Sequence, residues 1–362
     1  MAESRSKITS NGKGRTSDSQ VVATKPVRKS SPKVPVGAED WKHHPDLYMQ
    51  DGTLILLAED TVFRVYPGLL AMHSEVFRGM STISDHLPEE IEIYDGYPVV
   101  RLTDDAEDLA QFLKSTMGIN QFHAFKPTSF PIAAAVLRLS SKYMVDPLRH
   151  QTIEHFRRLI PKSFEDIGKE QSYKQVFGEE NPPHPFTVLT LFRQCQLTTF
   201  LPWAFYTACN EGFKALVNGD THDGAVIRLK TEDNRIALNG WKRLCDKTRQ
   251  LRSSVILSRP PTCKDATCAN EARLAWLDGA YWHIGSDVLS QWGMFKLLAT
   301  SSKPTQSPGR NSIQDQKIRG TRPCDLCTEA WLRQERELRV EAWTELPSYF
   351  GLPAWEDMTM EL

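Results

Sequence analysis

The stretch Asp51-Gly-Thr-Leu-Ile-Leu-Leu-Ala-Glu-Asp-Thr-Val-Phe-Arg-Val-Tyr-Pro-Gly-Leu-Leu-Ala-Met-His-Ser-Glu-Val-Phe77 carries most of the information about the fold. An apolar run over residues 53–58 follows the turn pair Asp51-Gly52, and an alternating run over 61–65 follows Glu59-Asp60. Two short apolar runs joined by an acidic turn predict a β-hairpin. Apolar residues then recur at helical spacing from Leu69 to Met80, so we expect a helix directly after the hairpin.

Strand and helix patterns continue to residue 159. Residues 98–102 predict a third strand, and Thr103-Asp-Asp105 is a suitable cap for a helix over 106–117 that ends at Gly118. Further helices are predicted over 132–144 and 147–159, the second beginning at a proline, whose missing N–H is not needed in a first turn. A few strands mixed with several helices predict an α+β domain over residues 40–160.

This region resembles the BTB/POZ family, in which a hairpin runs into a helix through the pattern Phe-x-Val-His-x-x-x-Leu-x-x-x-Ser-x-x-Phe. The residues that match the pattern are Phe63, Val65, Leu70, Ser74 and Phe77. Tyr66 stands where the family has His, and because Tyr keeps an apolar ring with a hydrogen-bonding tip, we expect the fold to be preserved. Features outside the pattern, such as Cys324-x-x-Cys327 and Trp343-x-x-Leu346-Pro347, are similar to BTB-containing proteins abundant in mushroom-forming fungi.

The resemblance implies an α+β BTB/POZ fold, a short β-sheet capped by helices, followed by a mostly α-helical C-terminal domain. It also implies a non-catalytic function in protein–protein interaction, through a homodimer, through docking to a partner, or as an adaptor for a cullin-type ubiquitin ligase. The matching positions are packing residues, so they indicate the fold more strongly than the partner. Neither of the glycine-rich phosphate-binding patterns, G-x-G-x-x-G and G-x-x-x-x-G-K-[ST], occurs. His73 and Ser74 are adjacent, but neighbouring positions on a helix do not face each other, so we expect no enzymatic activity.

Composition divides the rest of the chain into further segments. Residues 1–39 are rich in Ser, Thr, Lys and Arg with few large apolar residues, which predicts a disordered basic tail. Residues 161–185 contain several Pro and Gly and are expected to be a linker. Helical periodicity returns after residue 186 and predicts a mostly helical domain over 186–362. Within it, residues 301–322 are poor in apolar side chains and are expected to form a mobile insertion.

Charge and cysteine content narrow the class of protein. The chain of 362 residues has 44 basic and 45 acidic side chains, and a net charge of −1 argues against a general nucleic-acid binder. No apolar run approaches the roughly 20 residues that cross a bilayer, so we expect no membrane association. Seven cysteines are too few for a disulfide scaffold, and no signal pattern opens the sequence, which favours a reduced cytoplasmic or nuclear location. No small-molecule substrate is indicated.

Four cysteines form two closely spaced pairs, Cys263-x4-Cys268 and Cys324-x2-Cys327. Four thiolates around a tetrahedral Zn²⁺ are a common structural centre, so these residues are candidate metal ligands. The 55 residues between the pairs exceed the usual loop of a short zinc ribbon. Reduced structural thiols and disulfide or redox chemistry are therefore open alternatives to zinc. A zinc module together with the basic tail would suit a second function, that of a nuclear or chromatin-associated regulator.

Overall fold

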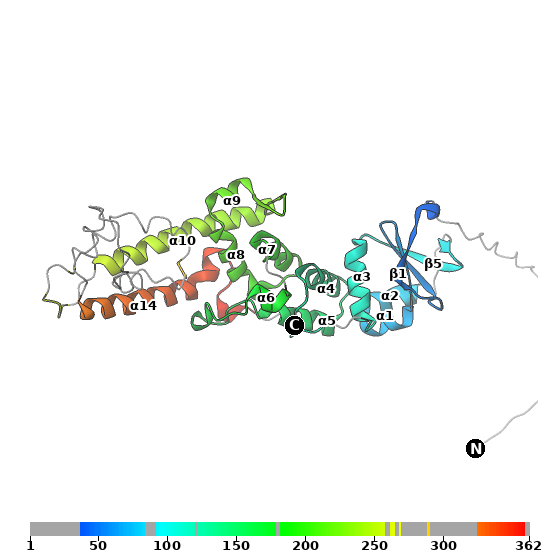
Figure 1. Ribbon diagram of the computed structural model, residues 1–362, viewed down its shortest axis with the longest axis horizontal. Coiled ribbons are helices and arrows are strands. Elements are labelled where there is room, and N and C mark those ends of the chain that lie inside the picture. Colours follow the sequence, from blue (N-terminus) through cyan, green and yellow to red (C-terminus); the bar gives the residue numbers. More distant parts are fainter. Residues whose placement is uncertain are drawn as a thin grey trace, which may run out of the picture.

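The computed structural model describes residues 37–83, 92–119, 122–178, 182–257, 261–264, 268, 288–289 and 324–358. The predicted insertion at 301–322 lies outside these residues, as does the basic tail up to residue 36. The molecule is elongated, with a β-sheet at one end and a pair of long helices at the other (Figure 1). It combines a small sheet with many helices, so the expected α+β class is confirmed.

A five-stranded sheet has the strand order β1-β3-β2-β5-β4. Its strands are β1 (Lys42–Tyr48), β2 (Leu54–Ala58), β3 (Thr61–Val65), β4 (Ile93–Tyr94) and β5 (Tyr97–Leu102). Strands β2 and β3 form the predicted antiparallel hairpin, in which Leu54 pairs with Val65 and Ala58 with Thr61. Strand β5, also predicted, pairs in parallel with β2, and β1 pairs in parallel with β3. The hairpin thus forms the centre of the sheet.

Five helices follow or connect these strands. They are α1 (Pro67–His73), α2 (Glu75–Ile83), α3 (Ala106–Thr116), α4 (Phe130–Lys142) and α5 (Asp146–Arg157). One face of the hairpin packs on these helices through residues such as Leu56 and Phe63, which are fully buried. Ile55, Leu57 and Val62 lie on the other face and pack under Tyr and Trp side chains. Both faces are covered, which explains why the β2 sequence is an almost continuous apolar run.

The single helix predicted from Leu69 to Met80 is two helices in the structure. The chain leaves the helical conformation at Ser74, where φ is −127° and ψ is 125°. The Ser74 hydroxyl accepts a hydrogen bond from the Phe77 N–H at 3.1 Å and so caps the second helix. The predicted start of α3 is confirmed, because the Asp105 carboxylate accepts from the Asp108 N–H at 3.0 Å.

The second half of the described chain is mostly helical. Its helices are α6 (Tyr173–Phe177), α7 (Pro185–Gln194), α8 (Leu201–Asn210), α9 (Phe213–Asn218), α10 (Thr231–Leu257) and α14 (Asp325–Tyr349). Short elements complete it: the 3-10 turns η3 (Phe164–Asp166), η4 (Thr198–Phe200) and η5 (Trp355–Asp357), and the hairpin strands β6 (Asp220–His222) and β7 (Ala225–Ile227). A further 3-10 turn, η1 (Ala38–Asp40), precedes β1. None of the described helices has an apolar stretch that could span a bilayer.

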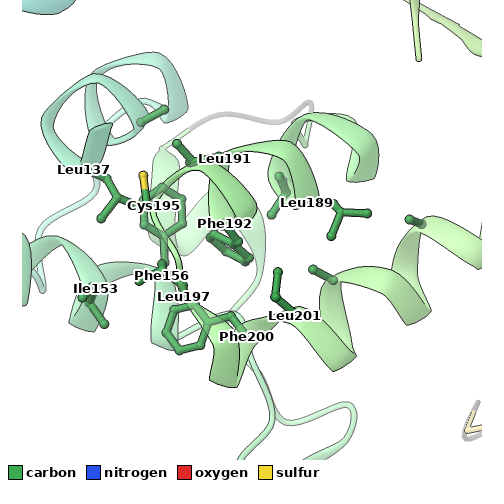
Figure 2. Packing of buried hydrophobic residues seen from close by; sticks show 14 of the residues in the cluster. Leu137, Ile153, Phe156, Leu189, Leu191, Phe192, Cys195, Leu197, Phe200 and Leu201 are labelled. Carbon is green, nitrogen blue, oxygen red and sulfur yellow. The ribbon is translucent and has the colours of Figure 1, made fainter. Parts of the chain in front are cut away.

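One continuous group of buried side chains runs from the sheet to the C-terminal helices. At its middle, Phe156 of α5 contacts the Phe192 ring of α7 with the centroids 5.6 Å apart, and Figure 2 shows the surrounding leucines. The segment that we expected to be a linker, residues 161–185, contributes to this packing. Its Phe177 is buried with the ring centroid 5.4 Å from that of Phe130. The sheet end and the helical end therefore share a packed core.

Helices α10 and α14 lie side by side with opposite chain directions at the end of the molecule far from the sheet (Figure 1). With 27 and 25 residues they are each about 40 Å long. Gly240 permits their close approach, since a Cβ there would lie 2.1 Å from the Phe350 ring. The Lys247 ammonium lies 2.9 Å from the Glu341 carboxylate and 3.0 Å from that of Glu345. Apolar contact and charge thus both hold the two helices together.

Candidate metal centre

The structure brings together the four cysteines that the sequence predicts as metal ligands. Cys263 and Cys268 follow the end of α10, Cys324 is the residue before α14, and Cys327 lies in the first turn of α14. Their four Sγ atoms all lie within 4.8 Å of one another. Because α10 and α14 run in opposite directions, the end of one and the start of the other meet at this point. The antiparallel pairing of the helices therefore assembles the cluster across the 55-residue gap.

The spacing of the sulfur atoms suits a tetrahedral metal ion. Zn–S bonds of about 2.3 Å in a regular tetrahedron place the sulfurs about 3.8 Å apart. The Sγ atoms of Cys263 and Cys324 are 3.7 Å apart, without a disulfide bond. The Cys324 N–H also points at the Cys268 Sγ, at 3.3 Å. A backbone N–H aimed at a ligand sulfur is the type of outer contact that orients metal ligands.

The cluster is largely closed to solvent. Cys268 and Cys327 are fully buried, Cys263 is 7% exposed, and Cys324 is half-buried. Burial raises the pKa of the Cys327 thiol, and its hydrogen bonds with the neighbouring thiols act in the same direction. For Cys268, the Cys324 N–H lowers the pKa, but burial and the hydrogen bonds with the Cys324 and Cys263 thiols outweigh it, so the net shift is upward. Without a cation these sulfurs favour the thiol form, whereas a bound cation favours thiolates.

The donor set indicates which metal the cluster could hold. Four sulfur ligands in a tetrahedral arrangement are typical of Zn²⁺ or of iron–sulfur sites, and they do not suit Mg²⁺ or Ca²⁺, which prefer oxygen. With all four positions filled by protein, no position is open for substrate, which is the arrangement of structural zinc sites. The cluster can therefore link the two helices but offers no coordination position for catalysis.

The three remaining cysteines lie apart from this cluster. Cys195 and Cys209 are buried, and burial raises the pKa of Cys195 to about 11. The Cys209 thiol donates to the Ala237 carbonyl at 3.3 Å. Cys245 on α10 is half-buried, with its pKa raised mainly by burial. Cys195 and Cys209 are the small core side chains that their apolar surroundings predict.

A second group of ligand-type side chains, His184, Glu211 and Asp220, was not predicted from the sequence. These residues share no short motif, because His184 precedes α7, Glu211 follows α8 and Asp220 begins β6. The His184 Nδ1 accepts from the Phe186 N–H at 3.1 Å, so the proton of the neutral ring lies on Nε2, 3.2 Å from Asp220. A metal on Nε2 would need that proton removed while Nδ1 still accepts. This geometry therefore fits a helix cap better than a metal site.

A groove of about 410 Å³ lies between α1, the end of α3 and the start of α5. Its lining includes Leu69, His73, Met117, Val145 and Leu148. Among the described residues nine large apolar side chains are exposed, and three of them are immediate sequence neighbours of groove residues: Met72, Ile119 and Met144. Exposed apolar side chains close to a groove are a feature of protein-binding surfaces.

No protein-family model matches this chain, and no curated protein matches it either. The resemblance to the BTB/POZ family therefore stays a prediction that rests on the sequence pattern from Phe63 to Phe77.

Proposed function

We propose that this chain is a non-catalytic protein-interaction protein of the BTB/POZ type, and that a zinc ion on its four clustered cysteines stabilises the helical end. The observation that carries the interaction function is the groove beside α1, α3 and α5, with exposed apolar side chains next to its lining residues in the sequence. When a partner covers such side chains, the complex is stabilised by about 25 cal/mol per Å² of buried apolar area. The surface therefore suits a partner that presents an apolar face.

Two features of the sheet end support the BTB/POZ assignment. All five residues that match the family pattern are buried, as packing residues should be: Phe63, Val65, Leu70, Ser74 and Phe77. The hairpin also runs directly into a helix, which the family pattern requires. By analogy with that family, the partner is a second copy of this chain or a cullin-type ubiquitin ligase scaffold, for which the chain acts as an adaptor.

The zinc has a structural role in this proposal. It joins the segment after α10 to the start of α14, and so closes the open end of the helix pair. Because the ligands meet only in the folded chain, the binding energy of the metal stabilises that fold. The groove lies beside α1, α3 and α5, whereas the cluster lies where α10 ends and α14 begins, at the end of the molecule far from the sheet (Figure 1). We therefore expect loss of the metal to affect the helical end first.

The interaction function is tested with the full chain, by sedimentation for self-association and by titration calorimetry with the purified N-terminal domain of a cullin-type scaffold. We expect at least one of the two complexes to form. Met144 is 54% exposed and precedes the groove residue Val145. Met144→Glu should weaken the complex, because the new carboxylate would have to be desolvated on binding. The matched control is Val226→Glu, an equally exposed apolar side chain on the β6–β7 hairpin. A chain that stays monomeric at micromolar concentration and does not bind the scaffold would contradict the proposal.

A further inference from the structure

We propose that the four-cysteine cluster is also a thiol switch, in which a hydroperoxide oxidises Cys324 and the product is a Cys263–Cys324 disulfide with loss of the metal. This inference rests on the zinc centre proposed above and names a regulation of that centre. Four cysteines could form several different disulfides, and the inference specifies that the bond joins Cys263 and Cys324.

Accessibility selects the first sulfur to react. Cys324 is the only half-buried member of the cluster, whereas Cys268 and Cys327 are fully buried. A dissolved oxidant must reach a sulfur along its line of attack, and susceptibility to oxidation follows exposure and thiolate character. Cys324 is therefore the member of the cluster that a dissolved oxidant reaches first.

Exposure selects the second sulfur, and its distance from the Cys324 sulfur allows the bond to form. The Cys263 Sγ lies 3.7 Å from the Cys324 Sγ, so it needs to move by less than 2 Å to reach the S–S bond length of about 2.0 Å. Cys263 is also the least buried of the three remaining cysteines, at 7% exposure against 0% for Cys268 and Cys327. The two more exposed cysteines of the cluster are therefore neighbours, whereas the other two are fully buried.

The reaction balances with hydrogen peroxide as the oxidant. The Cys324 thiolate attacks one peroxide oxygen, an S–O bond forms, the O–O bond breaks, and the released hydroxide takes a proton from solvent. The Cys263 thiolate then attacks the Cys324 sulfenic sulfur, the S–S bond forms, and the second hydroxide leaves and is protonated. Two thiolates thus lose two electrons to one peroxide, with two protons taken up and two waters formed. Two ligands do not retain the metal, and as Zn²⁺ leaves, the Cys268 and Cys327 thiolates each take up one further proton from solvent and become thiols.

The choice of pair decides what happens to the helices. A disulfide between Cys324 and Cys327, or between Cys263 and Cys268, would link residues within one segment and leave α10 and α14 free to separate at this end. A Cys263–Cys324 disulfide instead connects the same two segments that the metal connects. The oxidised protein would therefore keep its helix pair closed while losing its zinc, and reduction would restore the ligand set.

The experiment uses the full reduced chain, with its zinc content measured first. The protein is treated with hydrogen peroxide while a chelating dye follows released zinc, the remaining thiols are blocked, and the disulfides are mapped by peptide mass spectrometry. We expect zinc release to parallel a peptide pair that contains Cys263 and Cys324, with both changes reversed by a thiol reductant and added zinc. In Cys245→Ser, which removes a half-buried thiol of α10 outside the cluster, the same release and the same pair are expected.

Several results would overturn the inference. A Cys324–Cys327 or Cys263–Cys268 disulfide as the main product would show that the two more exposed cysteines do not pair. Zinc release without any disulfide, or oxidation of Cys245 before the cluster, would show that Cys324 is not the reactive thiol. A chain that is purified without zinc but still forms the Cys263–Cys324 bond would contradict the proposed metal and leave the predicted pairing correct, so the two claims fail separately.

Discussion

Ser74 and Tyr143 are joined by a buried hydrogen bond, in which the Ser74 hydroxyl donates to the Tyr143 backbone carbonyl. The two residues are 69 positions apart, and Ser74 is fully inaccessible to solvent. Ser74 lies at the break between α1 and α2, and Tyr143 follows the last turn of α4. One hydroxyl thus caps α2 and ties the helix break to the packed helices behind it.

Replacement of Ser74 by Ala should lower the free energy of unfolding by about 1–3 kcal/mol, because a buried carbonyl loses its partner and α2 loses its cap. Urea denaturation of the full chain measures this loss. The matched control is Ser115→Ala, whose hydroxyl bonds only to the Gln111 carbonyl within its own helix at 2.8 Å. Equal effects of the two substitutions would show that the long-range bond contributes nothing specific.

Gly240 tests the packing of α10 against the C-terminal residues. A Cβ there would lie 2.1 Å from the Phe350 ring, so Gly240→Ala should destabilise the chain by about 1–3 kcal/mol through overpacking. Gly68→Ala is the control, since Gly68 lies in α1 with open space around its Cβ position, and Ala should be neutral or slightly stabilising there. The midpoints of thermal unfolding of both variants, monitored by circular dichroism, measure the two effects. A Gly240→Ala protein as stable as Gly68→Ala would refute the close approach.

His155 makes stability depend on pH. Its side chain is fully buried, Nδ1 lies 3.0 Å from the Ala124 carbonyl, and Nε2 has no partner among the described residues. Burial lowers the pKa of His155 to about 4. In the unfolded chain the pKa of a histidine is about 6.5. Between pH 6.5 and pH 4, the unfolded chain therefore binds a proton at this histidine and the folded chain does not. Stability is therefore complete above pH 6.5 and falls as the pH approaches 4, by up to about 3 kcal/mol.

The variant His155→Phe should remove this part of the pH dependence. Denaturation at a series of pH values gives the slope for the variant and for the native chain. His150→Phe, at an exposed position of the same helix, should keep the native slope. If the slope between pH 6.5 and 4 is the same in all three proteins, His155 is not the group responsible.

Loss of the metal should act on the helical end of the molecule. Cys327→Ser removes one ligand, and we expect it to release the zinc and increase amide hydrogen exchange in the segments next to the cluster, at the end of α10 and the start of α14. The helices around the sheet should exchange as before. Cys245→Ser, which leaves the four ligands intact, should retain zinc and the native exchange pattern. Uniform exchange changes along the whole chain would contradict a local role for the metal.

The central elements could be predicted because their signals are local. Two apolar runs with a turn between them predict the hairpin of β2 and β3, and the Asp105 cap predicts the start of α3. Strand β1 was missed because it is a polar edge strand that contains Pro45, which breaks the usual strand pattern but is tolerated at a sheet edge. The break at Ser74 was also missed, since the hydrogen bond to Tyr143 that fixes it is a tertiary contact.

In the candidate site, too, local signals could be predicted from the sequence and tertiary contacts could not. The sequence identified the four cysteines from two short spacings, but whether the pairs meet depends on the antiparallel contact of α10 and α14. The contact between His184, which caps α7, and Asp220 has no sequence signal, because it joins residues 36 positions apart. The groove is likewise a product of three helices whose exposed apolar residues look unremarkable one at a time.

The zinc centre is tested most directly by elemental analysis of the full chain, purified without any exposure to chelators, beside the Cys327→Ser variant prepared in the same way. Four sulfur atoms within 4.8 Å of one another predict one zinc per native chain and none retained by the variant. Native protein that carries no zinc above the level of the buffer would contradict the metal centre and leave four buried thiols in its place.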